Sequence, residues 1–478
     1  MLCSTSISYS QQLAFPTAEG YGKYSVGGRG GSVYEVTTLN PSGPGSLGDA
    51  IGASVPRTVV FRVSGTIDGD FNISRDDITI AGQTAPGDGV CIRGSLSIGA
   101  DNVIIRYIRV RDEANGDAIG SRGHRNIILD HVSASWSSDE VLSIYHCENV
   151  TIQYCMITEA CSSSHRFGGI WGNNYGTYHH NLIAHNDSRN PRWASGCKYN
   201  DYRNNVIYNW GYNSCYGGEA QQSGSAEWNF STINMIANYY KAGPATRSGV
   251  RDRIAEPSAR GDGDEGSWYV VDNVVVDYPA VTANNWLGVD GSEFIQLNAP
   301  WDAMPINQQT PEDAYNAVLD HAGCSFPNRD AVDARIMEEV RNGTATYGDN
   351  GIITAPSDVG GWPPLQSGTA PVDSDHDGMP DSWESAHGLN PNNAADRNGD
   401  FDNDGYTNLE DYLNELVRTD SELARFRRGD TNADSNLDIA DAIFTLSYLF
   451  TEGSPPACID AADANDDGVV DISDAVMV

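Results

Sequence analysis

Short runs of β-branched and apolar residues recur at near-regular spacing between Asn102 and Arg192. Four of these runs begin at Asn102, Asn126, Asn149 and Thr177, which gives a period of about 25 residues. Each period holds one predicted strand and ends in polar residues, a pattern typical of a stacked solenoid. Stacking places equivalent positions of successive coils above one another, so residues that follow neighbouring strands share one face. The sequence therefore predicts an all-β fold built as a solenoid.

Changes in composition divide the chain into segments. Residues 14–362 contain the recurring strands and two predicted helices within 311–342. The Gly- and Pro-rich stretch 363–372 predicts a linker. Residues 373–478 hold 25 acidic and 5 basic residues in a chain whose formal charge is −36. A polyanion of this kind argues against nucleic acid as a partner, and the lack of a long apolar run argues against a membrane span.

The N-terminus and the cysteines bear on where the protein works. Residues 1–13 look like the end of a signal peptide whose start is missing, which predicts a secreted or cell-surface protein. The nine cysteines lack the paired spacing of a zinc ribbon. In a secreted protein some cysteines would pair, and Cys197 and Cys215, which flank one strand-turn-strand, are candidates.

Two acidic loops follow the linker. Each places carboxylates on alternate residues before a glycine, so that several oxygens can converge on one cation. This pattern resembles the thrombospondin type 3 calcium repeat over residues 373–416, and the resemblance implies bound Ca²⁺. The implied ligands are Asp373, Asp375, Asp377, Asp381 and Glu384 in the first loop, and Asp400, Asp402, Asp404 and Asp411 in the second.

The final segment, residues 428–478, contains two loops of twelve residues, each leading into an apolar helix. Aspartate or asparagine occupies positions 1, 3, 5, 9 and 12 of both loops, which resembles the dockerin module. The resemblance implies two further Ca²⁺ sites and a cohesin-like scaffold protein as partner. Because the second helix stops at Val478, the module is expected to be incomplete. The implied ligands are Asp430, Asn432, Asp434, Asp438 and Asp441, then Asp463, Asn465, Asp467, Asp471 and Asp474. The whole acidic tail is expected to be dispensable for chemistry, so truncation after about Trp362 is expected to leave activity intact.

Polar residues that follow the four strands form a constellation. Acidic residues come after the first strand (Asp112, Glu113 and Asp117) and after the second (Asp139 and Glu140). The sequence Arg189-Asn190-Pro191-Arg192 follows the fourth strand. Acids and arginines on one face of a solenoid predict a calcium-plus-arginine site suited to an anionic polysaccharide.

The region from Asn102 to Arg192, together with the later segment 203–211, resembles the pectate lyase family of single-stranded right-handed parallel β-helices. The resemblance implies a calcium-dependent lyase that cleaves polygalacturonate. Within it, Asp117 matches the first calcium ligand and Asp139 the first of two aspartates four residues apart. Ser143 stands where the second aspartate is expected.

The same resemblance assigns the basic residues. Arg189 matches the catalytic base, and Arg192 matches the arginine that holds the substrate carboxylate. A family lysine has no counterpart here, which leaves His165 or Arg166 to bind substrate in its place. Glu140, Asp112 or Glu113 is expected to compensate for Ser143 as a calcium ligand.

The implied chemistry explains these residue types. Removal of the weakly acidic C5 proton of a uronate requires positive charge at its carboxylate. An arginine acts as a base only where burial and nearby positive charge depress its pKa from above about 12. Two alternatives stay open: a β-helical glycoside hydrolase acting on pectic polymers, which would use clustered carboxylates, and a non-catalytic carbohydrate-binding solenoid.

Several polar residues have a structural interpretation. Asparagines beside the later strands are expected to hydrogen-bond turn backbone from coil to coil. Asp130 and His131 are expected to form a satisfied buried pair. His179 and His180 are expected to point to opposite faces of one strand, which disfavours a metal pair. The asparagines are Asn181, Asn204, Asn205, Asn209, Asn238 and Asn273.

Overall fold

The computed structural model describes residues 11–113, 116–291, 293–418, 429–432, 437–451, 453–456, 459–465 and 469–477. Most of the predicted signal remnant therefore lies outside the described residues, as do Asp434 and Asp467 of the predicted calcium loops. The chain forms two compact units, Met1–Asn414 and Glu415–Val478.

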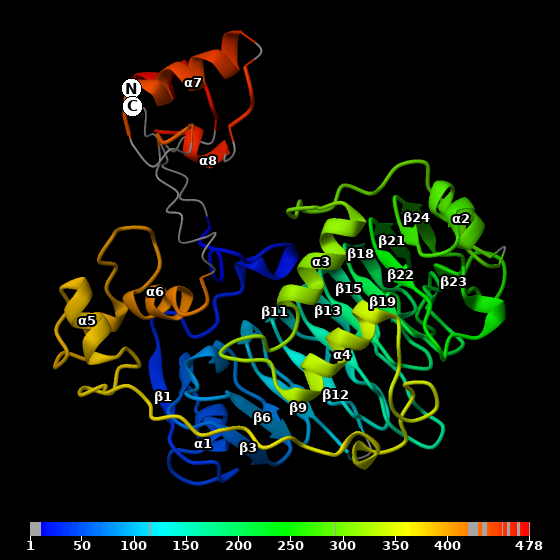
Figure 1. Ribbon diagram of the computed structural model, residues 1–478, viewed down its shortest axis with the longest axis horizontal. Coiled ribbons are helices and arrows are strands. Elements are labelled where there is room, and N and C mark those ends of the chain that lie inside the picture. Colours follow the sequence, from blue (N-terminus) through cyan, green and yellow to red (C-terminus); the bar gives the residue numbers. More distant parts are fainter. Residues whose placement is uncertain are drawn as a thin grey trace. The chain divides into compact units, whose positions relative to one another are not determined.

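The first unit is a right-handed parallel β-solenoid of about ten coils, as the strand spacing predicts. Its strands form three ladders in which every neighbouring pair is parallel (Figure 1). The first ladder contains β1 (Ser32–Val36), β2 (Arg57–Phe61), β5 (Ile78–Ala81), β8 (Val103–Arg106), β11 (Arg125–Asp130), β18 (Lys198–Arg203), β21 (Ser231–Ile236), β24 (Ser267–Val271) and β26 (Ile295–Gln296). The second contains β4 (Phe71–Ile73), β7 (Leu96–Ile98), β10 (Ile119–Arg122), β17 (Arg192–Trp193), β20 (Cys215–Gly217) and β23 (Ala255–Pro257).

Two long strands, β13 (Leu142–Gln153) and β15 (Ile170–His179), belong to both of these ladders and join them into one 17-stranded sheet. The third ladder is a separate 9-stranded sheet. It contains β3 (Gly65–Asp68), β6 (Val90–Arg93), β9 (Arg109–Arg111), β12 (Ser133–Ser135), β14 (Met156–Thr158), β16 (Leu182–Ala184), β19 (Val206–Tyr208), β22 (Tyr239–Lys241) and β25 (Val274–Val275).

Coil-to-coil register explains why β-branched residues recur in the sequence. Val103, Ile127 and Val150 lie directly above one another on three successive strands, and all three are fully buried. Such rows fill the interior with one continuous apolar core. Burial of each aliphatic side chain contributes about 1.5–3 kcal/mol, so the core holds the coils at fixed spacing and positions the residues in the turns between strands.

An asparagine ladder runs through one row of turns, which confirms the structural interpretation of these residues. From Asn205 onward, each buried member accepts the backbone N–H of the preceding asparagine in the ladder and donates to a backbone carbonyl. Asn181, the first member, accepts from the backbone N–H of Cys155. The ladder contains Asn181, Asn205, Asn238, Asn273 and Asn285. Asn204 and Asn209 also bond turn carbonyls.

Helices α3 (Pro311–His321) and α4 (Ala331–Asn342) lie across the 9-stranded sheet (Figure 1). Both fall within the predicted helical region. Their buried faces form a second apolar cluster with β16 and β19. A buried ion pair of Arg111 with Asp330 and Asp333 fixes the start of α4, where Asp330 also caps the helix.

The remaining short elements cover turns and edges of the first unit. Its helical elements are η1 (Tyr21–Tyr24), α1 (Leu47–Gly52), η2 (Gly82–Thr84), η3 (Ser248–Val250), α2 (Pro279–Ala283), η4 (Asn285–Gly288), η5 (Pro356–Val359), α5 (Asp381–His387), η6 (Asp396–Asn398) and α6 (Asn408–Glu415), whose last residue begins the second unit. The second unit contains α7 (Ile439–Phe450), α8 (Ile459–Ala462) and α9 (Ile472–Met477), and α7 packs against α9.

Two expectations about side chains are wrong. All seven cysteines of the described residues are free and buried. Cys215 does not bridge to Cys197, because its sulfur lies in the core 2.9 Å from the Trp193 indole nitrogen, which donates to it. His179 and His180 do not face apart: β15 ends at His179, the backbone turns, and the two Nδ1 atoms lie 2.8 Å apart.

The pair of Asp130 and His131 is confirmed, with 2.8 Å between Nδ1 and the carboxylate. Within the described ranges, we find no helix long and apolar enough to cross a membrane.

Candidate active site

Backbone register brings most of the predicted site residues onto neighbouring coils. β10 and β13 are paired from their first residues, so Asp117 and Glu140, each two residues before its strand, lie one above the other. Glu140 then pairs with Phe167, and Phe167 with Ser188. These four residues form one row along the solenoid. Arg189 is the residue after the last member of that row.

Carboxylates gather at the start of this row. Asp139, Glu140 and His165 each present a ligand atom within 4.8 Å of the others, and His165 Nε2 lies 2.7 Å from Asp139 Oδ1. Burial and the charge of Asp139 raise the pKa of Asp117 to about 7, against the opposing effects of Arg189 and a hydrogen bond from Ser143. The cluster therefore has more negative charge than its own cations balance. The carboxylate oxygens of Asp139 and Glu140 suit a hard cation such as Ca²⁺, whereas the His165 imidazole is a ligand typical of zinc and other transition metals.

Arg189 lies at the edge of the carboxylate cluster. Its guanidinium contacts the Glu140 carboxylate directly and lies 4.5 Å from the centre of the Phe167 ring. Its backbone is left-handed, with φ of 58°, and its carbonyl accepts from Gly169 one coil below. The side chain is 19% exposed, so it is held by both neighbours while one edge stays open to solvent.

The two other arginines of the predicted site are each held by an acid on a neighbouring coil. Arg166 lies 2.6 Å from Asp187, and Arg192 lies 3.1 Å from Glu219. Sequence reasoning missed Phe167, Asp187 and Glu219. Their part in the site depends on which coil lies above which, and no local motif contains that information.

Asp112 directly follows β9 of the 9-stranded sheet. It is 3% exposed, and its backbone N–H donates to the carbonyl of Ser135, the last residue of the neighbouring strand β12. Within the described residues, neither Asp112 nor Asp117 is among the acids whose ligand atoms converge with Asp139, although the charge of Asp139 acts on Asp117.

The thrombospondin-like loops also gather carboxylates. Asp373, Asp375 and Asp377 form one group, and Asp377 joins Glu384 and Asp396 in a second. Burial, followed by mutual repulsion, raises the pKa of Glu384 to about 8 and that of Asp377 to about 7. Such groups suit a divalent cation with oxygen ligands. Asp396 is a member that sequence reasoning missed.

The other predicted ligands of this segment divide into two kinds. Asp381 is not in either group, because its carboxylate accepts from Ser374. Asp400, Asp402 and Asp404 form a further group, and burial together with their charges raises the pKa of Asp411 to about 8.

The two dockerin-like loops have matching internal hydrogen bonds. Asp441 at position 12 accepts from the amides of Asn432 and Asp438, at 3.2 and 3.0 Å. Asp474 accepts from the equivalent amides of Asn465 and Asp471, at 3.1 and 2.8 Å. Asp430 and Asp463, at position 1, are buried.

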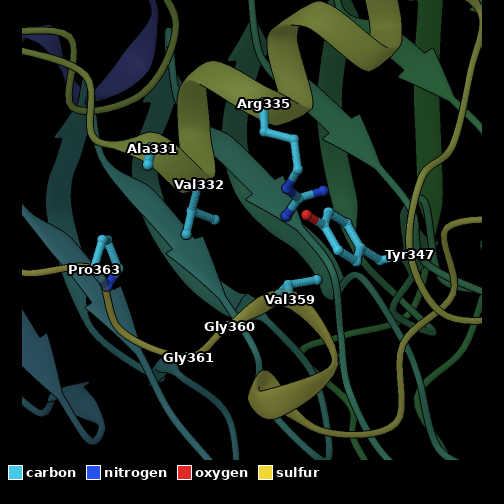
Figure 2. A pocket seen from close by; sticks show the side chains of 8 residues that line it. All are labelled: Ala331, Val332, Arg335, Tyr347, Val359, Gly360, Gly361 and Pro363. Atoms are coloured by element: carbon cyan, nitrogen blue, oxygen red, sulfur yellow. The ribbon is translucent and has the colours of Figure 1, made fainter.

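A separate cavity of 340 Å³ lies between α4 and residues 359–363 (Figure 2). The Arg335 side chain points into it beside Tyr347. Arg335 is already paired with Glu159 at 2.7 Å and with Glu339 at 3.1 Å. The two acids outweigh its single positive charge, so the cavity does not resemble a site for an anionic sugar.

Comparisons with known proteins identify relatives of this chain. No protein-family model matches the chain. A curated relative named probable pectate lyase C, from Aspergillus flavus, is 37% identical over 432 residues, which cover 87% of this chain and 97% of the relative. A protein of the same name from Emericella nidulans is 38% identical and covers 85% of this chain and 93% of the relative.

Solved structures are more distant. The cedar pollen allergen Jun a 1 aligns with a TM-score of 0.48 at 17% identity. The alignment covers 64% of this chain and 92% of the allergen. A pectate lyase from Bacillus sp. N165, solved with trigalacturonate, aligns with a TM-score of 0.42 at 17% identity, over 64% and 98% of the two chains. Because the sequence match to the curated relatives extends over most of both chains, this chain belongs to the pectate lyase family and is a pectate lyase.

Proposed function

We propose that the enzyme cleaves polygalacturonate by β-elimination, with Arg189 as the base and Ca²⁺ as cofactor. The observation that supports this most is the position of Arg189, which follows the last residue of the row and contacts the carboxylate cluster at Glu140. A bound Ca²⁺ would neutralise that carboxylate and supply the nearby positive charge that an arginine base needs. An anionic polymer needs both features at one place: cationic groups that receive its carboxylates and a base within reach of the C5 proton.

The residues have separate roles in this proposal. In a β-elimination a base removes the C5 proton, the bond between C4 and O4 breaks, and a C4–C5 double bond forms. O4 leaves with a proton taken from water, and the base returns the C5 proton to solvent. Arg189 accepts the C5 proton. Arg192 binds a uronate carboxylate. His165 and Arg166, which lie next to the carboxylate cluster, have the same role. Glu219 and Asp187 orient the two binding arginines.

Asp117, Asp139 and Glu140 would hold the Ca²⁺, with Ser143 in place of a fourth carboxylate. When bound, the ion would supply positive charge opposite the substrate carboxylate and so make the C5 proton more acidic. The raised pKa of Asp117 supports this role, since a buried acid beside a second carboxylate is stabilised by a cation.

The test is an assay of purified enzyme on polygalacturonate, methylated pectin and other uronic acid polymers. Lyase action gives an unsaturated product with a new ultraviolet absorbance, and chelation should abolish that signal until Ca²⁺ is returned. New reducing ends without the absorbance would instead indicate a glycoside hydrolase. Binding without any product would indicate a non-catalytic solenoid.

The proposal extends to localisation and to the second unit. A secreted enzyme would meet a plant cell-wall polymer outside the cell, and the second unit would attach it to a cohesin-like scaffold protein. Support comes from an exposed apolar stripe on α7, where Ile439, Ile443 and Phe450 are 77%, 60% and 66% exposed. Ile443→Asp should abolish binding to a purified cohesin module, and unchanged binding would refute this attachment.

A further inference from the structure

The segment Asp373–Asn414, here called the carboxylate segment, contains acids that the rest of the protein does not neutralise. Asp377 and Glu384 are completely buried. Both oxygens of Glu384 and one oxygen of Asp377 have no hydrogen-bond partner. Burial of unpaired carboxylates is costly, and Asp375 and Asp396 lie in the same groups. These unpartnered oxygens point to a bound cation.

The loop that holds these acids is attached to the first two strands of the solenoid. Arg62, next to β2, lies 3.2 Å from Glu35 on β1 and 3.7 Å from Asp373. His376 lies 2.7 Å from the same Glu35. Gly378 has a φ of 94°, and a Cβ atom at that position would approach Val33 of β1 to 3.2 Å. The loop backbone therefore lies directly on the strand.

The end of the carboxylate segment is attached to the same side of the coils. Arg29 donates to both carboxylate oxygens of Glu410, at 2.8 and 3.0 Å. Arg106 of β8 donates to Asn414 at 3.1 Å. The apolar residues between these attachments are buried: Met379, Tyr406, Leu409, Tyr412 and Leu413.

These observations place a cation group and its attachment to the solenoid in one folded segment. We propose that the carboxylate segment is a calcium-dependent clamp, in which cation binding stabilises the first coils of the β-solenoid through Arg62, Glu35 and Arg29. This inference rests on the proposed binding of Ca²⁺ by the segment. Terminal coils have a neighbour on one side only and need a cap. Without the cation, repulsion among the buried acids opens the loop, and its contacts with β1 and β2 are lost.

The experiment measures hydrogen exchange of β1 and β2 in the full-length protein, with Ca²⁺ and with chelator, alongside the melting temperature followed by tryptophan fluorescence. Ca²⁺ should slow exchange in both strands at least tenfold and raise the Tm on the order of 5 °C. Glu384→Gln should lose both effects. Asp139→Asn in the catalytic cluster and Asp474→Asn in the second unit are matched controls that should keep the protection of β1 and β2.

A second variant tests the attachment and keeps every carboxylate of the cation group. Arg62→Gln should keep calorimetric binding of Ca²⁺ by the segment but lose most of the protection of β1. If Ca²⁺ binds to the carboxylate segment of the unmodified protein but does not change hydrogen exchange in β1 and β2, the clamp is refuted. Calcium binding by the segment would still stand. Identical calcium stoichiometry in Glu384→Gln and the unmodified protein would refute calcium binding at this group as well. Lyase activity is a separate readout, so neither result bears on the role of Arg189.

Discussion

Replacement of Arg189 by lysine tests the proposed mechanism most directly. Lysine keeps the positive charge beside Glu140 and above the Phe167 ring, which Arg189 approaches to 4.5 Å. The fold should therefore survive, with a loss of unfolding free energy below about 2 kcal/mol. A compact ammonium on a different stem does not present a nitrogen where the planar guanidinium does. A positioned base contributes about 10²–10⁴ in rate, which corresponds to about 2.7–5.5 kcal/mol of barrier.

The assay is initial-rate formation of unsaturated uronide, with circular dichroism and Tm as checks of folding. We expect kcat of Arg189→Lys to fall by at least a hundredfold, with KM changed little. Arg166→Lys is the matched comparison, since Arg166 is also ion-paired, at 2.6 Å from Asp187. The effect of Arg166→Lys should appear in KM, because Arg166 binds substrate in the ground state and in the transition state alike. A folded Arg189→Lys enzyme with unchanged kcat would refute the assignment of the base.

Three further predictions concern the cation site and stability. Ser143→Asp adds a carboxylate beside Asp117, so the calcium concentration for half-maximal activity should fall; an unchanged value would contradict the ligand assignment. Asn205→Ala removes a buried ladder amide and leaves its partners unsatisfied, so chemical denaturation should show a loss of about 3 kcal/mol or more. Although burial opposes it, the His185 imidazole, 3.2 Å away, helps to lower the pKa of Glu339 to about 2. The lowered pKa means that this carboxylate stabilises the fold above about pH 4.5 and loses that effect as the pH falls toward 2. Glu339→Gln should therefore reduce the Tm at pH 7, and the difference from the unmodified protein should shrink as the pH falls below 4.

The fold was predictable because its signal is periodic. The sequence shows one run of β-branched residues for each coil. It also shows the asparagines that stack in the turns. The fusion of two ladders by β13 and β15 was not predictable, because continuity of a strand through a turn depends on the coils on both sides. The same dependence on tertiary context explains the error at His179 and His180, where the strand ends between the two residues.

The site was predictable where a residue has a local motif and not where its role comes from register. Asp117, Asp139 and Arg189 lie next to strands that can be recognised from the sequence. Asp187 and Glu219 look like ordinary surface acids in sequence, and only the stacking of coils places them against Arg166 and Arg192. Asp396 was missed for a related reason, since it follows Glu384 by twelve residues and lies outside the alternating pattern.

Truncation of the acidic tail tests how far the enzyme extends along the chain. Composition alone predicts that a cut after Trp362 is harmless, but the structure puts Met1–Asn414 in one compact unit. The backbone N–H of Gln366 donates to the Asp88 carboxylate at 2.7 Å, and Arg29 pairs with Glu410. A cut after Trp362 removes these attachments and uncovers the apolar surface that Leu409 and its neighbours cover.

We therefore expect a protein ending at Glu415 to match the full chain in Tm and kcat, and one ending at Trp362 to melt several degrees lower and to aggregate. Both should be compared in the presence of Ca²⁺, by calorimetry and by light scattering. The shorter protein should still show some turnover when folded, since its catalytic row from Asp117 to Arg189 is complete. Equal Tm values for the two truncations would show that the carboxylate segment contributes nothing to the solenoid, and its contacts with β1 would then be incidental.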